Sequence, residues 1–133
     1  LLEGLSGQSS PDIITIADHP MDTHGKSTGR AGCSELEEPY GVPYRCLIPK
    51  EYKNLLIASR AAGFSSLAAS SCRLSRTMMQ LGQAAGTAVW LAIQTGVLLP
   101  EVAPEKLRDA LKAQHVQLEY PLTSELKEYL RNE

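Results

Sequence analysis

The sequence predicts an α/β fold, and three observations along its 133 residues support this prediction. Short runs of apolar and β-branched residues are typical of strands, and a long segment without charge is typical of a buried helix. Between them lies a loop rich in serine, alanine and glycine that carries arginines. A strand, a small-residue loop and a helix N-terminus form an arrangement that brings backbone N–H groups close to a phosphate or another anion.

The N-terminal third predicts two strands separated by a long loop. Residues 12–17 contain several β-branched side chains and are followed by Asp-His-Pro, which favours a strand that ends there. Residues 18–39 are rich in Gly, Ser, Thr and Glu and are expected to form a loop. The second predicted strand, residues 42–48, contains Pro43, which restricts it to a sheet edge or a bulge.

The remaining elements are one strand and three helices. Residues 55–58, Leu-Leu-Ile-Ala, are typical of a short strand buried on both faces. The predicted long helix spans residues 78–97, and the next begins at Pro104 and runs to about residue 115. A last helix is predicted over residues 125–130, with Ser124 as its N-cap.

Composition excludes several classes of function. A net charge of −2 provides no basic field to attract nucleic acid. Residues 78–100 carry no charge, but glutamine and threonine recur among them and no aromatic or basic anchors flank them. We therefore expect a buried helix of a soluble protein and no membrane span, with the compartment left open between cytoplasmic and periplasmic. The three cysteines are widely spaced without a C-x-x-C pair, which predicts free thiols.

Two histidines and two aspartates lie close together in the first loop. Imidazole and carboxylate groups are good metal ligands, but these four lie within seven residues of a loop, which is too tight for a regular site. We therefore expect no metal. The alternatives are solvated loop side chains or a role on the substrate side for Asp22 or His24.

Residues 54–86 carry a specific resemblance to a known family. Residues 54–60 are Asn-Leu-Leu-Ile-Ala-Ser-Arg, and residues 81–86 are Leu-Gly-Gln-Ala-Ala-Gly. This stretch resembles the last strand, loop and helix of the two-domain FAD-dependent oxidoreductases. The likeness continues upstream through residues 40–49 and, more loosely, through residues 20–24. One departure is Ser59, because the family usually has glycine before the arginine that ends the strand.

The resemblance implies the C-terminal fragment of an FAD-binding, Rossmann-like fold of the glutathione-reductase type. Residues 1–50 would end the substrate-binding domain, residues 51–100 would hold the last strand and helix of the FAD domain, and residues 101–133 would form C-terminal helices. The G-x-G-x-x-G turn that seats a pyrophosphate does not occur in the sequence. An N-terminal FAD domain of the same polypeptide is therefore the expected partner, and the fragment alone is expected to be inactive.

The resemblance also implies hydride transfer between FAD and a small organic substrate, whose identity the sequence leaves open. With Ser75 as N-cap, the following backbone amides would point outward, toward the flavin ring of related proteins. The implied cofactor-binding residues are Ala58, Ser59, Arg60, Ser75, Arg76, Thr77 and Met78.

Three arginines, Arg60, Arg73 and Arg76, lie around the start of the long helix. Because the positive end of a helix favours anions, cations at this position have two explanations. Either they are solvated or paired with carboxylates, or an anion binds nearby. The candidates for the catalytic step are Arg73 and His24.

A second interpretation belongs to a different class of protein. The long helix is rich in small residues, and an apolar helix of this kind can drive self-association. The chain would then be a non-catalytic domain that packs through this helix. Under either interpretation we expect a homo-oligomer.

Overall fold

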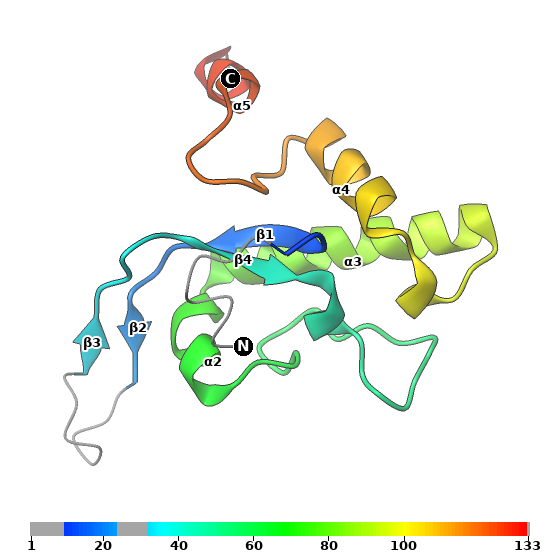
Figure 1. The fold of residues 1–133 in the computed structure, drawn as a ribbon, viewed down its shortest axis with the longest axis horizontal. Coiled ribbons are helices and arrows are strands. Elements are labelled where there is room, and N and C mark those ends of the chain that lie inside the picture. The colour runs from blue at the N-terminus through cyan, green and yellow to red at the C-terminus, as the bar shows by residue number, and fades with distance from the viewer. Residues whose placement is uncertain (1–9, 24–31, 133) are drawn as a thin grey trace.

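The computed structural model describes residues 10–23 and 32–132, which form two small sheets and a set of helices (Figure 1). In chain order the elements are β1 (Ile13–Ala17), β2 (Met21–Asp22), β3 (Cys33–Ser34), β4 (Tyr40–Pro43), the 3-10 helix η2 (Tyr44–Leu47), α2 (Ser66–Cys72), α3 (Ser75–Thr95), the 3-10 helix η3 (Leu99–Glu101), α4 (Pro104–Ala113) and α5 (Ser124–Asn132). This mixture of helices and small antiparallel sheets is compatible with the predicted α/β fragment.

Strands β1 and β4 form the central ladder. They pair antiparallel, with Ala17 opposite Tyr40 and Thr15 opposite Val42. The ladder is packed so closely that a Cβ on Gly41 would lie 2.4 Å from the side chain of Ile13, which explains the glycine at this position. The predicted strand over residues 12–17 is confirmed, beginning one residue later.

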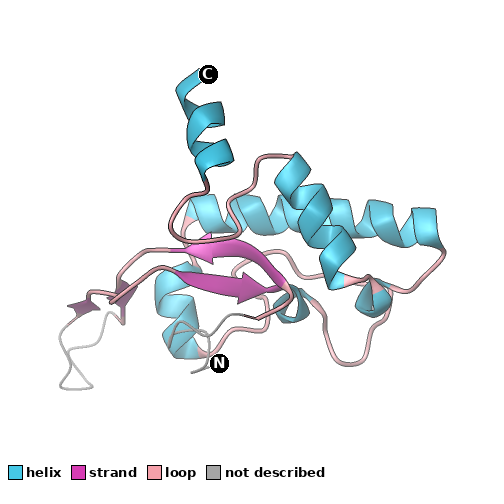
Figure 2. Cartoon of the chain, turned by 45° about the horizontal axis from the view of Figure 1, so that its top comes forward, coloured by secondary structure: helices cyan, strands magenta, loops and turns pink. Residues whose placement is uncertain are grey.

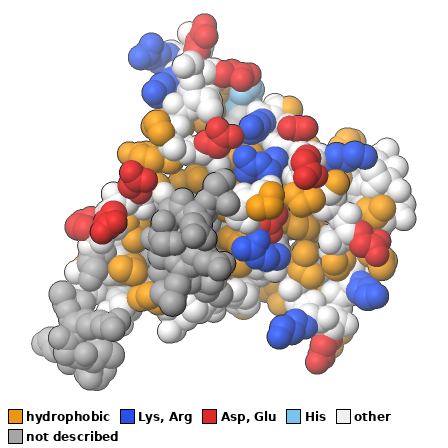
Figure 3. Space-filling view, viewed as in Figure 1, with side chains coloured by type: hydrophobic (Ala, Val, Ile, Leu, Met, Phe, Trp, Pro, Cys, Tyr) orange, Lys and Arg blue, Asp and Glu red, His pale blue; other side chains and the backbone are white. Residues whose placement is uncertain are grey.

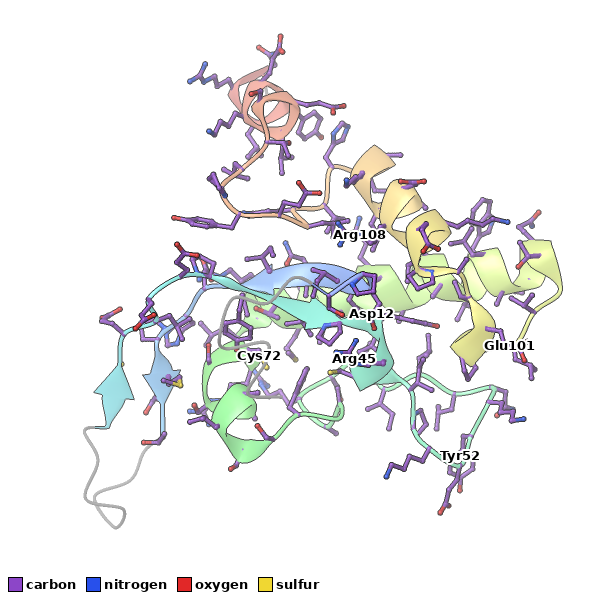
Figure 4. The ribbon with its side chains drawn as sticks, in the orientation of Figure 1. Asp12, Arg45, Tyr52, Cys72, Glu101 and Arg108 are labelled. Atoms are coloured by element: carbon purple, nitrogen blue, oxygen red, sulfur yellow. The ribbon has the colours of Figure 1, made fainter. Side chains whose placement is uncertain are left out.

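The predicted strand over residues 42–48 is wrong beyond Pro43. Proline cannot donate to a ladder, and the chain turns there into η2. Asp12 holds this turn, because its backbone carbonyl accepts from the Tyr44 N–H at 2.7 Å and its carboxylate accepts from the Arg45 N–H at 3.2 Å. The Arg45 side chain also donates to the Asp12 carboxylate at 2.6 Å, and Figure 4 shows the two residues side by side.

A second, shorter ladder lies within the predicted loop 18–39. Met21 pairs with Ser34 and Asp22 pairs with Cys33, antiparallel. Beyond this ladder the Thr23 N–H donates to the Gly32 carbonyl at 3.0 Å. The β2–β3 hairpin projects from the body of the molecule beside α2 (Figure 1).

Helix α3 runs along β1 and forms the main layer of the core (Figure 2). The predicted long helix is confirmed, although it begins three residues earlier and ends at Thr95. Gly96 ends it in the left-handed conformation, with φ of 68°. Its buried face is made mostly of small side chains, which allow close approach to the ladder; the buried residues are Thr77, Leu81, Ala84, Thr87, Ala88 and Ala92.

Residues 55–58, predicted as a buried strand, do not form one. The Ile57 N–H donates to the Leu47 carbonyl at 2.8 Å, but no described strand pairs with the segment. Leu55 is 43% exposed. The sequence pattern suits a strand, yet a strand requires a neighbouring ladder, and the described residues supply none.

Residues 66–72 lie in a predicted loop but form helix α2. The Ser65 hydroxyl caps this helix by accepting from the Ala68 N–H at 3.2 Å. Serine and alanine are common both in loops and at helix starts, so composition alone did not distinguish the two.

The C-terminal helices agree with the prediction except at one cap. Helix α4 begins at Pro104 as predicted and buries Leu107 and Leu111. In α5 the predicted cap Ser124 is already helical, and Thr123 caps instead, its hydroxyl accepting from the Leu126 N–H at 3.3 Å. Across the described parts of the chain, every helix is too short or too polar to span a membrane.

Candidate functional site

The junction between α2 and α3 is the part of the fold in which the predicted site residues meet. Helix α2 ends at Cys72, Arg73 and Leu74 follow, and α3 begins at Ser75. The prediction that Ser75 is the N-cap is wrong. Leu74 occupies that position with an extended backbone, and its carbonyl accepts from the Met78 N–H at 3.0 Å.

This cap geometry changes which backbone amides can serve a ligand. The Met78 amide is used inside the helix, so the expectation that it points outward is wrong. The amides of Ser75, Arg76 and Thr77 precede this first intrahelical hydrogen bond, and Leu74 offers no side-chain acceptor. Three N–H groups at the positive end of a 21-residue helix therefore form the donor set of the junction.

Two of the three arginines at the junction are tied to each other. Arg60 donates from Nε to the Arg73 carbonyl at 3.0 Å, which links the loop before α2 to the end of α2. Arg73 donates from Nη2 to the Asp22 carbonyl at 3.3 Å, and the same nitrogen lies 3.6 Å from the Asp22 carboxylate. Arg76 forms an ion pair with the Asp18 carboxylate.

The structure thus shows carboxylate partners for Arg73 and Arg76, one of the two alternatives that the sequence left open. Among the described residues, these three arginines and two aspartates together carry one net positive charge. Both ion pairs are partly solvent-exposed, with the Arg76 side chain 58% exposed and the Asp18 side chain 42% exposed. Charge of this sign beside a helix N-terminus favours an anionic group.

Asp22 is the last residue of β2, and Asp18 lies in the segment that connects β1 to β2. This segment is fixed to α2, because the buried Ser71 hydroxyl donates to the His19 carbonyl at 2.5 Å. His19 itself contacts the Pro20 carbonyl through Nδ1 at 2.7 Å. No cluster of metal-ligating side chains is found within residues 10–23 and 32–132, and His24 lies outside the described residues.

Ala58 and Ser59 lie in the segment that leads to Arg60. Ser59 begins a turn, in which its hydroxyl accepts from the Ala61 N–H at 3.1 Å and its carbonyl accepts from the Ala62 N–H at 3.0 Å. Ala62 is buried, so the turn is anchored in the core, and Arg60 is the residue of this segment that reaches the α2–α3 junction.

Beneath the junction lies a group of buried neutral side chains. Burial raises the pKa of Cys72 to about 11 and that of Tyr40 to about 12. Figure 4 shows Cys72 at the end of α2, and it is fully buried. A buried thiol that stays protonated is a poor nucleophile, so Cys72 belongs to the core and not to the chemistry of the site. The other two thiols are Cys46, half-buried, and Cys33, exposed.

The donor set would suit a planar group that becomes anionic, as the flavin of FAD does on reduction. Backbone amides and guanidinium groups at a helix N-terminus are the groups that stabilise negative charge. Two cavities, of about 130 and 350 Å³, are lined by residues of other regions, around α5 and beside the β1–β4 ladder. On the face shown in Figure 3 acidic and basic side chains alternate without a basic stripe.

The sequence pointed to the arginines and the helix N-terminus but not to Asp18 and Asp22 as their partners. Both aspartates stood out only in a loop cluster that was judged too tight for a metal site, and Asp22 also as a candidate on the substrate side. Nothing in a single sequence pairs a loop residue with a helix more than fifty positions later. The signal that could have found them is the excess of cations at a helix start, which requires nearby anions.

Comparison with known proteins identifies the family. The family model described as FAD dependent oxidoreductase matches residues 3–111, which is most of the chain. Searches of curated proteins and of solved structures each found no match. The matched range includes every residue of the α2–α3 junction and ends within α4.

Proposed function

Because the chain belongs to the FAD-dependent oxidoreductases, whose cofactor is FAD, we propose that its α2–α3 junction forms one side of the FAD site. The observation that carries this proposal is the gathering of Arg60, Arg73 and Arg76 at the α2–α3 junction. When bound, FAD supplies the hydride acceptor or donor for a small organic substrate.

The residues of this chain would act on the cofactor through electrostatics and positioning. The amides of Ser75, Arg76 and Thr77 and the positive end of α3 would stabilise negative charge on the nearest edge of the flavin. Thr77 is only 2% exposed, so it anchors the first turn in the core and keeps these amides in place. Such a role depends on the backbone, which explains how apolar Met78 and Met79 can follow directly.

The remaining parts of the site would come from elsewhere in the same polypeptide. The sequence contains no G-x-G-x-x-G turn, so an N-terminal FAD domain would hold the pyrophosphate. In this proposal residues 1–50 end the substrate-binding domain, residues 51–100 complete the FAD domain, and residues 101–133 form C-terminal helices. The contact of β1 with α3 would join the first two sections.

A non-catalytic, self-associating domain is the alternative function, and one observation favours it. Several large apolar side chains on α3 face solvent, and among them Met79 is 68%, Trp90 56% and Ile93 73% exposed. An exposed apolar helix face of this kind marks an association surface. Trp90 and Ile93 lie in the second half of α3, away from its first turn, so association through them and flavin binding can belong to one protein.

The substitution Arg73→Ala in the full-length flavoenzyme tests the proposed function. We expect flavin content or turnover to fall at least about tenfold, equivalent to about 1.4 kcal/mol. Arg73→Lys should restore only part of the loss, because a point charge replaces a planar fork. Arg131→Ala, in the last turn of α5, is the matched control and should retain full flavin. Full flavin content and activity in a folded Arg73→Ala protein would contradict the proposal.

A further inference from the structure

Asp18 occupies a position that the fold holds firmly. It is the first residue after β1, whose last residue, Ala17, is fully buried and pairs with Tyr40. On its other side the His19 carbonyl accepts a hydrogen bond of 2.5 Å from the Ser71 hydroxyl, and Ser71 is only 1% exposed. The backbone on both sides of Asp18 is therefore fixed to the core, while its carboxylate reaches the surface.

The partner of Asp18 is equally well placed. Arg76 is the second residue of α3, and the next residue, Thr77, is buried. Nη2 of Arg76 forms an ion pair with Oδ1 of Asp18. This contact joins the end of β1 to the first turn of α3, which is the part of the helix that carries the free backbone amides.

A contribution to the stability of the fold does not explain why Asp18 and Arg76 form this ion pair. More than a third of each side chain is exposed, and ion pairs in contact with solvent contribute little to stability. A cation in the first turn also opposes the helix dipole, whereas an anion there is favourable. Asp18 therefore compensates a charge that the helix itself disfavours, at the point where the proposed FAD site lies.

We propose that Asp18 is a positioning residue for Arg76 and thereby sets the reduction potential of FAD bound at the junction. The inference rests on the proposed function. Asp18 would act in two ways, by holding the guanidinium beside the first turn of α3 and by offsetting part of its positive charge. A negative charge near a redox cofactor opposes the gain of electrons and lowers its potential, and a positive charge raises it.

The experiment measures the midpoint potential of the flavin-loaded, full-length enzyme by spectroelectrochemistry. Asp18→Asn should raise the potential and Arg76→Gln should lower it. The double variant should return close to the wild-type value, because both charges are removed together. Asp18→Glu keeps the charge and should lie nearer to wild type than Asp18→Asn. Glu119→Gln removes a surface acid that pairs with Lys112 at 3.0 Å, away from the junction, and should not change the potential.

Two further results separate this inference from the proposed function. If Arg76→Gln lowers the potential but Asp18→Asn leaves it unchanged, the role of Asp18 is refuted and the site stands. If neither these variants nor Arg73→Gln changes the potential or the flavin content, FAD does not lie beside α3 and the proposed function fails. Thermal unfolding of Asp18→Asn should match wild type, and a large loss of stability would show that the pair is structural.

Discussion

Arg60 donates a hydrogen bond of 3.0 Å to the backbone carbonyl of Arg73, thirteen residues further along the chain. Arg73 is the C-cap of α2, where carbonyl groups lack intrahelical donors. A guanidinium at this position satisfies one such carbonyl and is favourable for the negative end of the helix. The three arginines of the junction therefore divide their roles, because Arg60 serves the end of α2 while Arg73 and Arg76 contact the aspartates.

Two buried tyrosines on and after β4 should respond oppositely to the same substitution. The Tyr40 hydroxyl is buried without a hydrogen-bond partner among the described residues, whereas the Tyr44 hydroxyl donates to the Leu99 carbonyl at 2.8 Å. Tyr40→Phe should leave the free energy of unfolding unchanged or raise it by up to about 1 kcal/mol, and Tyr44→Phe should lower it by about 1–3 kcal/mol. Urea unfolding of both variants checks this, and a larger loss in Tyr40→Phe would reveal a partner for its hydroxyl.

The chain should lose stability at alkaline pH. Burial raises the pKa values of Tyr40 and Tyr44 from 10.0 to about 12 and that of Cys72 from 9.0 to about 11. Below about pH 9 these neutral groups make their full contribution to the free energy of unfolding. The contribution is lost as the pH rises toward 12, because the same groups release their protons at lower pH in the unfolded chain. Each such group adds a slope of about 1.4 kcal/mol per pH unit within its window.

Circular dichroism between pH 8 and 12, with phenolate absorbance recorded in parallel, measures this loss. Ionisation of the two tyrosines should coincide with unfolding instead of preceding it. The Tyr40→Phe, Tyr44→Phe double variant should show a shallower decline above pH 10. A decline that is as steep in the double variant would assign the effect to other groups.

Expressed alone, the chain should not retain flavin. It offers the amides of α3 and the arginines of the junction but no G-x-G-x-x-G turn for the pyrophosphate. We expect a colourless protein whose absorbance spectrum lacks flavin bands before and after denaturation. A yellow preparation that releases FAD would show that the chain contains a phosphate site of another kind.

The isolated chain should associate through the exposed face of α3, most simply as a two-fold dimer. Ile93 is 73% exposed on this face, and a Cβ on Gly86 would have no described atom within 4 Å other than its chain neighbours and the backbone of its own helix. Ile93→Lys and Gly86→Leu should both shift sedimentation toward monomer without loss of helix content, whereas the neighbouring change Gln94→Lys should not. A wild-type chain that remains monomeric at concentrations on the order of tens of micromolar would contradict this prediction.

Local sequence patterns were sufficient for the elements that carry their own signal. β1 was found from its β-branched residues, α3 from its long run without charge, and α4 from Pro104 at its start and the helical spacing of its leucines, each to within a few residues. Residues 55–58 have an equally good pattern but no described partner strand, which no local pattern can reveal. Strand β4 ends at Pro43, before the predicted end at residue 48, because Pro43 and the distant Asp12 together favour a turn.

The sequence predicted that the arginines would cluster at the start of α3, but it did not predict their aspartate partners or the residue that caps the helix. The arginines, the helix start and their closeness follow from residues that are near one another in sequence. The cap did not follow, because Ser75 is the better capping residue type, yet Leu74 holds the extended backbone that the α2–α3 turn requires. The aspartate partners are surface contacts between distant segments, and such contacts leave no periodic or compositional trace in one sequence.

The pairing of Ala17 with Tyr40 has a consequence for how proteins with this fold can diverge. The two ends of residues 18–39 lie close together, because they adjoin the paired residues Ala17 and Tyr40. Within this segment Thr23 and Gly32 also lie close together, joined by a backbone hydrogen bond. A segment inserted between two residues that already lie close together lowers the free energy of unfolding only slightly, since doubling the length of a loop costs only about 0.6 kcal/mol in closure entropy. A change of chain length beyond Thr23 would therefore leave Asp18 in its place beside α3, because the β1–β4 ladder fixes the residue before it. The Thr23–Gly32 pair is therefore the natural point for grafting a new recognition loop onto this scaffold.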